Sequence, residues 1–201
     1  MVRRSVAAVW LGAALSSAAL LAAGQALTRQ DSASMQRKLE TITARGVQPH
    51  AGTPALKTSF TEREVNAYFK YDGQPHLPVG VVDPQIVIKD GGQLEGRATV
   101  DLDAVRKAQS NAMLNLLALF AGSVEVRAVG RLQTANGKGT FLLDSATVAG
   151  LPVPKSVLQS VVTHYSKNPD LPDGFDLDKP FDLPAAIRSV ELQRGSATII
   201  Q

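Results

Sequence analysis

Three histidines, His50, His76 and His164, are the side chains in this 201-residue chain best suited to acid–base or metal chemistry. None is spaced from another as in the zinc-binding His-x-x-x-His pair, and the sequence has no Gly-x-Ser-x-Gly turn to present a catalytic serine. Cysteine is absent, which excludes disulfides, thiolate metal sites and cysteine nucleophiles. We therefore predict no catalytic residue, and a spatial triad built on His164 stays open as an alternative.

Oxygen ligands for a cation are concentrated near the C-terminus. Five aspartates fall within thirteen residues there: Asp170, Asp173, Asp176, Asp178 and Asp182. Calcium prefers such ligands, but the spacing differs from that of an EF-hand loop and no glutamate closes the set. The prolines interleaved with them favour a stiff, solvated loop whose aspartates stabilise turns. We predict no metal and no cofactor, with calcium binding by this loop as the alternative.

The most informative segment is apolar. Residues 108–124 contain no charge, and only Asn111 and Asn115 give the expected helix over residues 103–121 a narrow polar edge. A surface helix normally has one apolar stripe and a charged back. This helix is therefore expected either to be buried on two sides in a solid core or to line a groove for an apolar ligand. The candidate lining residues, from this segment and from the helix after residue 154, are Leu114, Leu117, Phe120, Val161 and Tyr165.

The N-terminus has the layout of an export signal. Arg3 and Arg4 precede 22 uncharged residues, Val6 to Leu27, and Gly24-Gln25-Ala26 offers small residues at a cleavage site. We predict a signal peptide over residues 1–26. The alternative is an uncleaved membrane anchor, because about 20 apolar residues can span a bilayer. Both predict an exported protein, periplasmic or otherwise extracytoplasmic.

Charge gives no sign of a nucleic-acid partner. The formal net charge is +3, from 21 basic and 18 acidic residues. Loss of residues 1–26 would remove two arginines and leave 19 basic residues, so the remaining chain is nearly neutral. No basic cluster interleaved with aromatic residues is present. We exclude nucleic acid as a partner, and nothing in the sequence indicates a protein partner.

Periodicity predicts a mixture of helices and antiparallel strands. Residues 28–45 have apolar residues at helical spacing, and Thr61-Glu62-Arg63-Glu64 fits a capping box that opens a second helix. Residues 85–89 are a strand candidate before the turn Asp90-Gly91-Gly92, and residues 94–102 alternate cleanly between apolar and polar. Gly96 within this run permits strong curvature or a bulge.

The second half repeats this pattern. Alternation over residues 124–132, the turn at Asn136-Gly137 and a return strand over residues 140–149 predict a hairpin. A helix follows residue 154, and residues 190–201 form a closing hairpin around Gly195. The fold class is therefore α+β: a strongly curved antiparallel sheet packed on amphipathic helices. The expected organisation is a signal or anchor (1–26), an N-terminal helix and linker (27–58) and a single α+β domain (59–201).

Three short patches resemble a known superfamily. Residues 60–69, FTEREVNAYF, are similar to a helix opening in small bacterial envelope proteins of the tubular lipid-binding (TULIP) type. Gly150-Leu151-Pro152-Val153-Pro154 before a helix and Leu183-Pro184-Ala185-Ala186-Ile187 before a closing hairpin resemble segments of the same group. The resemblance implies a TULIP-like half-barrel, a curved sheet around a long helix that encloses an apolar lumen. Binding in that group depends on lining residues, so the resemblance carries over no site residue.

Together these features predict an exported, non-catalytic envelope protein. It is expected to bind a lipid or other apolar ligand in a groove between sheet and helices, for lipid transport or envelope maintenance, with possible contact to a membrane surface. The alternative is a structural or interaction protein of the envelope with a solid core. A hydrolase is a third class, for which the sequence has no assembled nucleophile motif.

Overall fold

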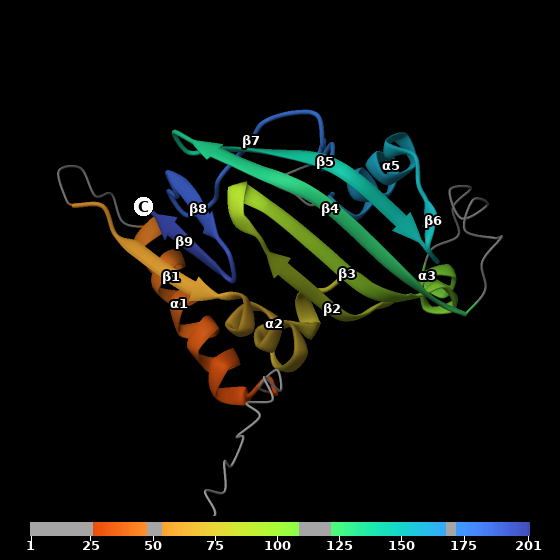
Figure 1. Cartoon of the computed structure of the whole chain (residues 1–201), viewed down its shortest axis with the longest axis horizontal. Coiled ribbons are helices and arrows are strands. Elements are labelled where there is room, and N and C mark those ends of the chain that lie inside the picture. Colours follow the sequence, from red (N-terminus) through yellow and green to blue (C-terminus); the bar gives the residue numbers. More distant parts are fainter. Residues whose placement is uncertain (1–25, 48–53, 109–121, 168–171) are drawn as a thin grey trace, which may run out of the picture.

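The computed structural model describes residues 26–47, 54–108, 122–167 and 172–201, and it is α+β (Figure 1). Its strands form two antiparallel sheets, one of six strands and one of three. The prediction of an α+β fold built on antiparallel strands is confirmed. The larger sheet is open, because its strands run in one path from β2 to β6 without returning to the first.

The six-stranded sheet follows the chain from one hairpin to the next. Its main path is β2 (Val81–Ile88), β3 (Gln93–Asp101), β4 (Ser123–Ala135), β5 (Lys138–Val148) and β6 (Leu151–Pro152), and β7 (Phe181–Asp182) pairs with β5. The predicted turn at Asn136-Gly137 is confirmed: both residues have positive φ, 51° and 78°, as a two-residue hairpin turn requires. The strand predicted over residues 94–102 is β3.

Gly96 lies in regular pairing, opposite Ile86 on one side and Ala128 on the other. The irregularities in register lie elsewhere, between Val82 and Gln85 and between Val129 and Gly130. The sequence allowed either strong curvature or a bulge at Gly96, and the regular pairing shows that Gly96 does not form a bulge.

The closing hairpin belongs to a sheet of its own, which the sequence analysis did not foresee. Strand β8 (Ser189–Gln193) pairs with β9 (Ser196–Ile200), and β9 pairs on its other edge with β1 (Lys57–Thr61). The small sheet therefore has the order β1-β9-β8, with β8 as the edge strand nearest to the larger sheet. The two sheets meet where the Thr134 side chain of β4 bonds to the backbone of Val190 in β8.

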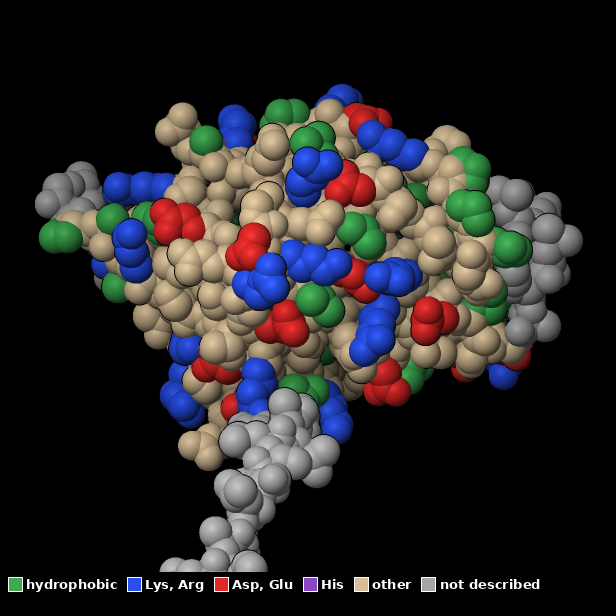
Figure 2. Space-filling model, in the orientation of Figure 1, with side chains coloured by type: hydrophobic (Ala, Val, Ile, Leu, Met, Phe, Trp, Pro, Cys, Tyr) green, Lys and Arg blue, Asp and Glu red, His purple; other side chains and the backbone are tan. Residues whose placement is uncertain are grey.

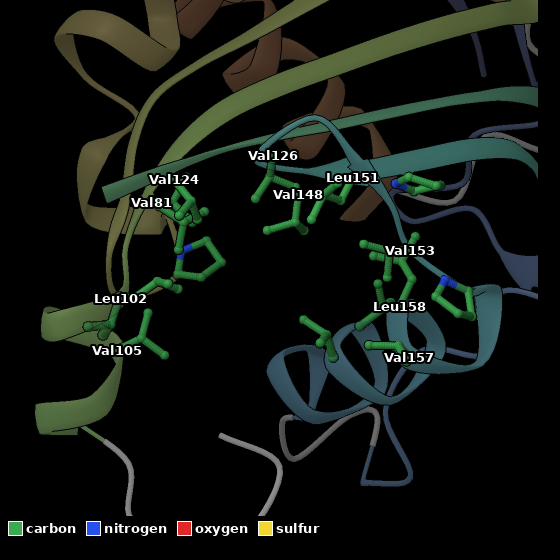
Figure 3. A pocket seen from close by; sticks show the side chains of 17 residues that line it. Val81, Leu102, Val105, Val124, Val126, Val148, Leu151, Val153, Val157 and Leu158 are labelled. Carbon is green, nitrogen blue, oxygen red and sulfur yellow. The ribbon is translucent and has the colours of Figure 1, made fainter. Parts of the chain in front are cut away.

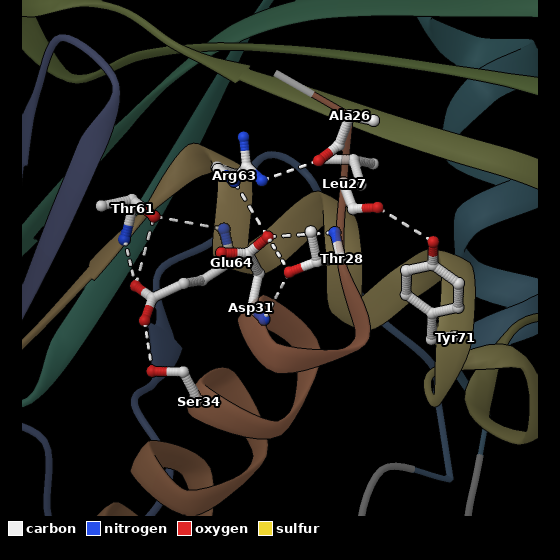
Figure 4. Close-up of polar contacts among 9 residues, drawn as sticks. All are labelled: Ala26, Leu27, Thr28, Asp31, Ser34, Thr61, Arg63, Glu64 and Tyr71. Atoms are coloured by element: carbon white, nitrogen blue, oxygen red, sulfur yellow. Dashed lines mark hydrogen bonds and ion pairs between the residues drawn. The ribbon is translucent and has the colours of Figure 1, made fainter.

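Two helices occupy the end of the molecule beside this small sheet. Helix α1 (Arg29–Val47) packs against α2 (Glu62–Tyr71), and it buries Ser32, Met35 and Ile42. The predicted capping box is present: Thr61 caps α2, and the Glu64 carboxylate accepts a hydrogen bond from the Thr61 backbone amide. Figure 4 shows how this corner is held, with Tyr71 and Arg63 donating to the backbone carbonyls of Leu27 and Ala26.

Helices α3 (Leu102–Ala108) and α5 (Lys155–Ser166) lie at the other end of the larger sheet (Figure 1). Two short 3-10 turns complete the described helices: η1 (Gln74–His76) follows and contacts α2, and η2 (Asp90–Gly92) joins β2 to β3. Helix α3 begins where the helix predicted over residues 103–121 begins, and residues 109–121 lie outside the described part. Within the described ranges, no helix combines the length and apolarity needed to cross a bilayer.

Candidate functional site

A cavity of about 500 Å³ lies between one face of the six-stranded sheet and helices α3 and α5 (Figure 3). Every lining residue in the described part of the chain is apolar, and together these residues comprise eleven valines, three leucines and three prolines. The lining residues are Pro78, Val79, Val81, Val100, Leu102, Val105, Val124, Val126, Val148, Leu151, Pro152, Val153, Pro154, Val157, Leu158, Val161 and Val162.

The sheet supplies the floor of the cavity through cross-strand rows of valine. Val81 lies opposite Val100, and Val100 opposite Val124, so three strands contribute to one row. Val126 lies opposite Val148 in a second row. Directly opposed residues share a face of a sheet, and alternate residues of a strand return to that face. We call this side of the sheet, defined by these five valines, the pocket face.

Helix α5 supplies the wall that faces the sheet. Its residues Val157, Leu158, Val161 and Val162 fall at helical spacing, so they form one stripe. The helix is held from another side by polar contacts: Gln159 bonds to the backbone of Phe175 and Leu177, and Thr163 donates to the Phe175 carbonyl. Because the loop at residues 175–177 anchors α5, the apolar stripe stands across the cavity from the valine rows.

A tight turn brings the segment before α5 to the cavity. Ala149 and Gly150 both have positive φ, 51° and 78°, and they turn β5 back into β6. The Val153 amide then donates to the Ala146 carbonyl at 2.9 Å. Leu151, Val153 and the two prolines between and after them therefore border the cavity at the end of the sheet.

The opposite wall comes from the start of α3. Leu102 and Val105 are almost fully buried there, at 2% and 4% exposure. The Asp101 carboxylate accepts from the backbone amides of Asp103 and Ala104 and so caps this helix. Figure 3 shows Leu102 and Val105 facing Val157 and Leu158 across the space.

The cavity has a mouth at which apolar side chains meet solvent. Val79 and Leu151 line it and are also 53% and 59% exposed. These two side chains border both the cavity and the surface, so the described part of the cavity is open to solvent along this rim.

The other side of the sheet is charged. Glu95, Arg97, Arg127 and Arg131 share this side, which we call the charged face, and Figure 2 shows basic and acidic side chains gathered over the middle of the molecule. Glu95 pairs with Lys89 at 2.8 Å and with Arg127 at 2.6 Å. The hydrogen bonds from Lys89 and Arg127 hold the pKa of Glu95 below its ordinary value. Ionised groups are thus on one side of the sheet and the apolar cavity on the other.

A second hollow, of about 590 Å³, is lined by charged groups that already pair with one another. It lies near Glu62, Lys89, Asp90 and Arg194. Arg194 pairs with Asp90 at 2.9 Å, and the Glu62 carboxylate accepts from the Ile88 amide at 2.7 Å. The charged groups of this hollow are thus engaged in contacts that hold the fold together. We therefore take the apolar cavity as the candidate site.

Of the five residues proposed from the sequence, Val161 lines the cavity. Tyr165 belongs to the same helix, but its side chain is not among those described. Leu114, Leu117 and Phe120 lie outside the described residues. The lining valines of the strands were not among the predicted site residues. Their signal in the sequence is the alternation over residues 94–102 and 124–132, which predicts strands with an apolar face.

Among the described residues, the groups considered for metal or acid–base chemistry are dispersed. In the described part of the aspartate-rich loop, Asp176, Asp178 and Asp182 pair with Lys179, Lys155 and Lys138. Nowhere in the described ranges do three or more metal-ligating side chains come together. His76 lies exposed in η1 and His164 lies on α5, and His50 is outside the described residues.

Comparison of the chain with protein-family models, with curated proteins and with solved structures gave no match. The apolar cavity is therefore interpreted from its own geometry and chemistry.

Proposed function

We propose that this protein binds a lipid or another apolar ligand in the cavity between the pocket face and helix α5, and that it does so without catalysis. The observation that carries the proposal is the lining: seventeen apolar residues around about 500 Å³, with an open rim at Val79 and Leu151. The volume falls within the roughly 300–1,000 Å³ typical of small-molecule pockets. Protein interiors normally close such spaces by packing side chains into them.

Hydrophobic transfer alone is enough for useful affinity at such a site. Burial of one methylene contributes about 0.8 kcal/mol, so a dozen methylenes contribute roughly 10 kcal/mol before the costs of association. The ligand then needs no hydrogen bond from the protein. This explains how a binding site can consist of valine, leucine and proline, and why no site motif marks it in the sequence.

The N-terminal sequence supports a place outside the cytoplasm for this activity. The basic, apolar and small-residue order of residues 1–26 is that of an export signal. We propose an envelope protein, periplasmic or anchored by its N-terminus, that acts in lipid transport or envelope maintenance. The TULIP-like half-barrel remains part of this proposal, supported by an open antiparallel sheet with a continuous apolar face.

The test is native mass spectrometry of the protein isolated from the extracytoplasmic fraction, followed by solvent extraction and lipid analysis. We expect a complex heavier than the polypeptide by the mass of one lipid-like molecule, and the same molecule in the extract. Polypeptide mass alone, together with no uptake of added fatty acid or phospholipid, would contradict the proposal. That outcome would favour an interaction protein of the envelope in which the cavity is merely imperfect packing.

A further inference from the structure

We propose that the cavity takes one aliphatic chain of a single-chain amphiphile, such as a fatty acid or a lysophospholipid, and leaves the head group outside. This inference rests on the proposed function, because it specifies the ligand of the same cavity. Volume, lining chemistry and the position of the rim carry it.

Volume limits the number of chains. A cavity of roughly 150 Å³ holds benzene, a ligand of six carbons. At that packing, about 500 Å³ accommodates on the order of twenty carbons. That is one chain of membrane-lipid length. Two palmitoyl chains together have about 32 carbons and exceed this capacity.

The lining excludes the head group. None of the seventeen lining side chains carries a hydrogen-bond donor or acceptor, and three of them are prolines, which lack a backbone N–H. A phosphate, carboxylate or ester drawn against this described lining would lose its water without gaining a side-chain partner there, which is strongly unfavourable. The head group must therefore remain at the rim beside Val79 and Leu151, where it keeps its contact with water.

The side-chain types favour a flexible aliphatic chain over a ring system. Eleven of the lining residues are valines, whose branched Cβ restricts χ1, so the walls adapt little to a broader ligand. No aromatic or methionine side chain is among the described lining residues. Aromatic faces stack on planar ligands and methionine adapts to irregular ones, and this cavity offers neither.

The test compares three probes with identical chains on the purified full-length protein after its ligand is stripped: palmitic acid, palmitoyl lysophosphatidylcholine and dipalmitoyl phosphatidylcholine. Equilibrium dialysis gives the Kd of each probe, and native mass spectrometry gives its stoichiometry. We expect the two single-chain probes to bind one to one with Kd values within about fivefold of each other, and the two-chain probe to bind at least about tenfold more weakly.

Each other outcome has a definite meaning. A one-to-one complex with the two-chain probe, as tight as that with the lysolipid, would overturn the single-chain inference and leave the proposed function standing. Kd values that differ by more than about tenfold between the two single-chain probes would show that the protein contacts the head group, which also overturns the inference. Binding of none of the three would defeat both the inference and the proposed function.

Discussion

At the scale of single residues, Glu64 joins helices α1 and α2 through one carboxylate. Its oxygens accept from the Thr61 amide in the capping box, from the Ser34 hydroxyl and from the Lys38 ammonium at 2.7 and 2.8 Å. Glu64 is 9% exposed. Burial alone would raise the pKa of this carboxyl, but the hydrogen bonds from Lys38, Ser34 and Thr61 outweigh it and the pKa is lowered overall.

The lowered pKa of Glu64 makes the stability of the folded protein depend on pH. A carboxyl whose pKa is depressed on folding stabilises the fold above its unfolded pKa, ordinarily 4.5, and that stabilisation is lost as the pH falls through the folded pKa. We expect Glu64→Gln to lower the free energy of unfolding by about 1–3 kcal/mol at neutral pH. The difference from the unmodified protein should shrink in acid.

Chemical denaturation at a series of pH values, from about 7 down to about 3, measures this difference. If the difference in free energy of unfolding between the two proteins stayed constant or grew toward acid, the ionised carboxylate would not be what stabilises the helix pair.

Of the contacts that Glu64 makes, only the capping box was predictable from the sequence. The Thr61-x-x-Glu64 spacing predicts the capping box because both partners lie within one helical turn. Ser34 and Lys38 lie some thirty residues earlier in the chain. Only the packing of α1 on α2 brings them to the carboxylate, and no local pattern encodes that packing.

At the scale of elements, the end of α1 fits closely against the loop before β8. A Cβ built on Gly46 would lie 2.4 Å from the Ala185 Cα, a distance that real structures do not tolerate. The same loop receives the Gln201 side chain, which donates to the carbonyls of Ala185 and Ile42. Gly46 therefore lets three distant parts of the chain meet.

We expect Gly46→Ala to destabilise the protein by about 1–3 kcal/mol, the usual cost of forcing extra atoms into a packed site. Alanine is intrinsically favoured over glycine within a helix by about 1 kcal/mol, so the close contact must reverse the ordinary sign of the change. Thermal unfolding of the purified variant measures the effect.

Gly96→Ala is the matched control for this change. A Cβ at Gly96 meets no atom within 4 Å, and this residue lies in a strand, so we expect a neutral or slightly stabilising effect. Equal melting temperatures for the two variants would contradict the close packing of α1 on the loop.

Elements were predictable where the signal was local. The two hairpins of the larger sheet were marked by turn residues and alternation, and helices α2 and α5 by a cap or an apolar stripe. Strand β1 was not foreseen, because its five residues carry no turn signal and their partner β9 lies near the other end of the chain. The third strand of the small sheet depends on that single long-range pairing.

At the scale of the whole molecule, the larger sheet separates two environments. Ion pairs cover the charged face, and the pocket face presents valines to a space that α3 and α5 border without filling. Alternation in the sequence predicts that such strands have an apolar face. It does not predict whether a helix closes onto that face or stands off it, because that distance is set by anchors such as Gln159 on the loop at residues 175–177.

Because local patterns do not predict where a cavity forms, most of the lining residues were not among those predicted from the sequence. The predicted site residues come from the most apolar helical segments of the sequence, and among them Val161 lines the cavity. Most of the lining comes instead from strands and from the segment between β5 and α5. Each strand from β2 to β5 contributes one or two valines, and the segment contributes Leu151, Pro152, Val153 and Pro154; such residues carry no signal until the fold assembles them.

A pair of substitutions in β4 tests the central claim most directly. Val126 and Val129 are both half-buried, but Val126 lines the cavity, whereas Val129 lies opposite Glu95 on the charged face. Tryptophan at either position adds the same bulk to the same strand. Ligand retention and melting temperature are measured together on both variants.

We predict that Val126→Trp lowers the amount of bound lipid at least about tenfold with a melting temperature within a few degrees of the unmodified protein, because the new ring enters open space. Val129→Trp should retain the ligand. If the space is ordinary core, Val126→Trp should instead overpack it and cost about 1–3 kcal/mol, or several degrees in melting temperature. Such a loss of stability, with lipid binding unchanged or absent in all three proteins, would contradict a ligand-binding cavity.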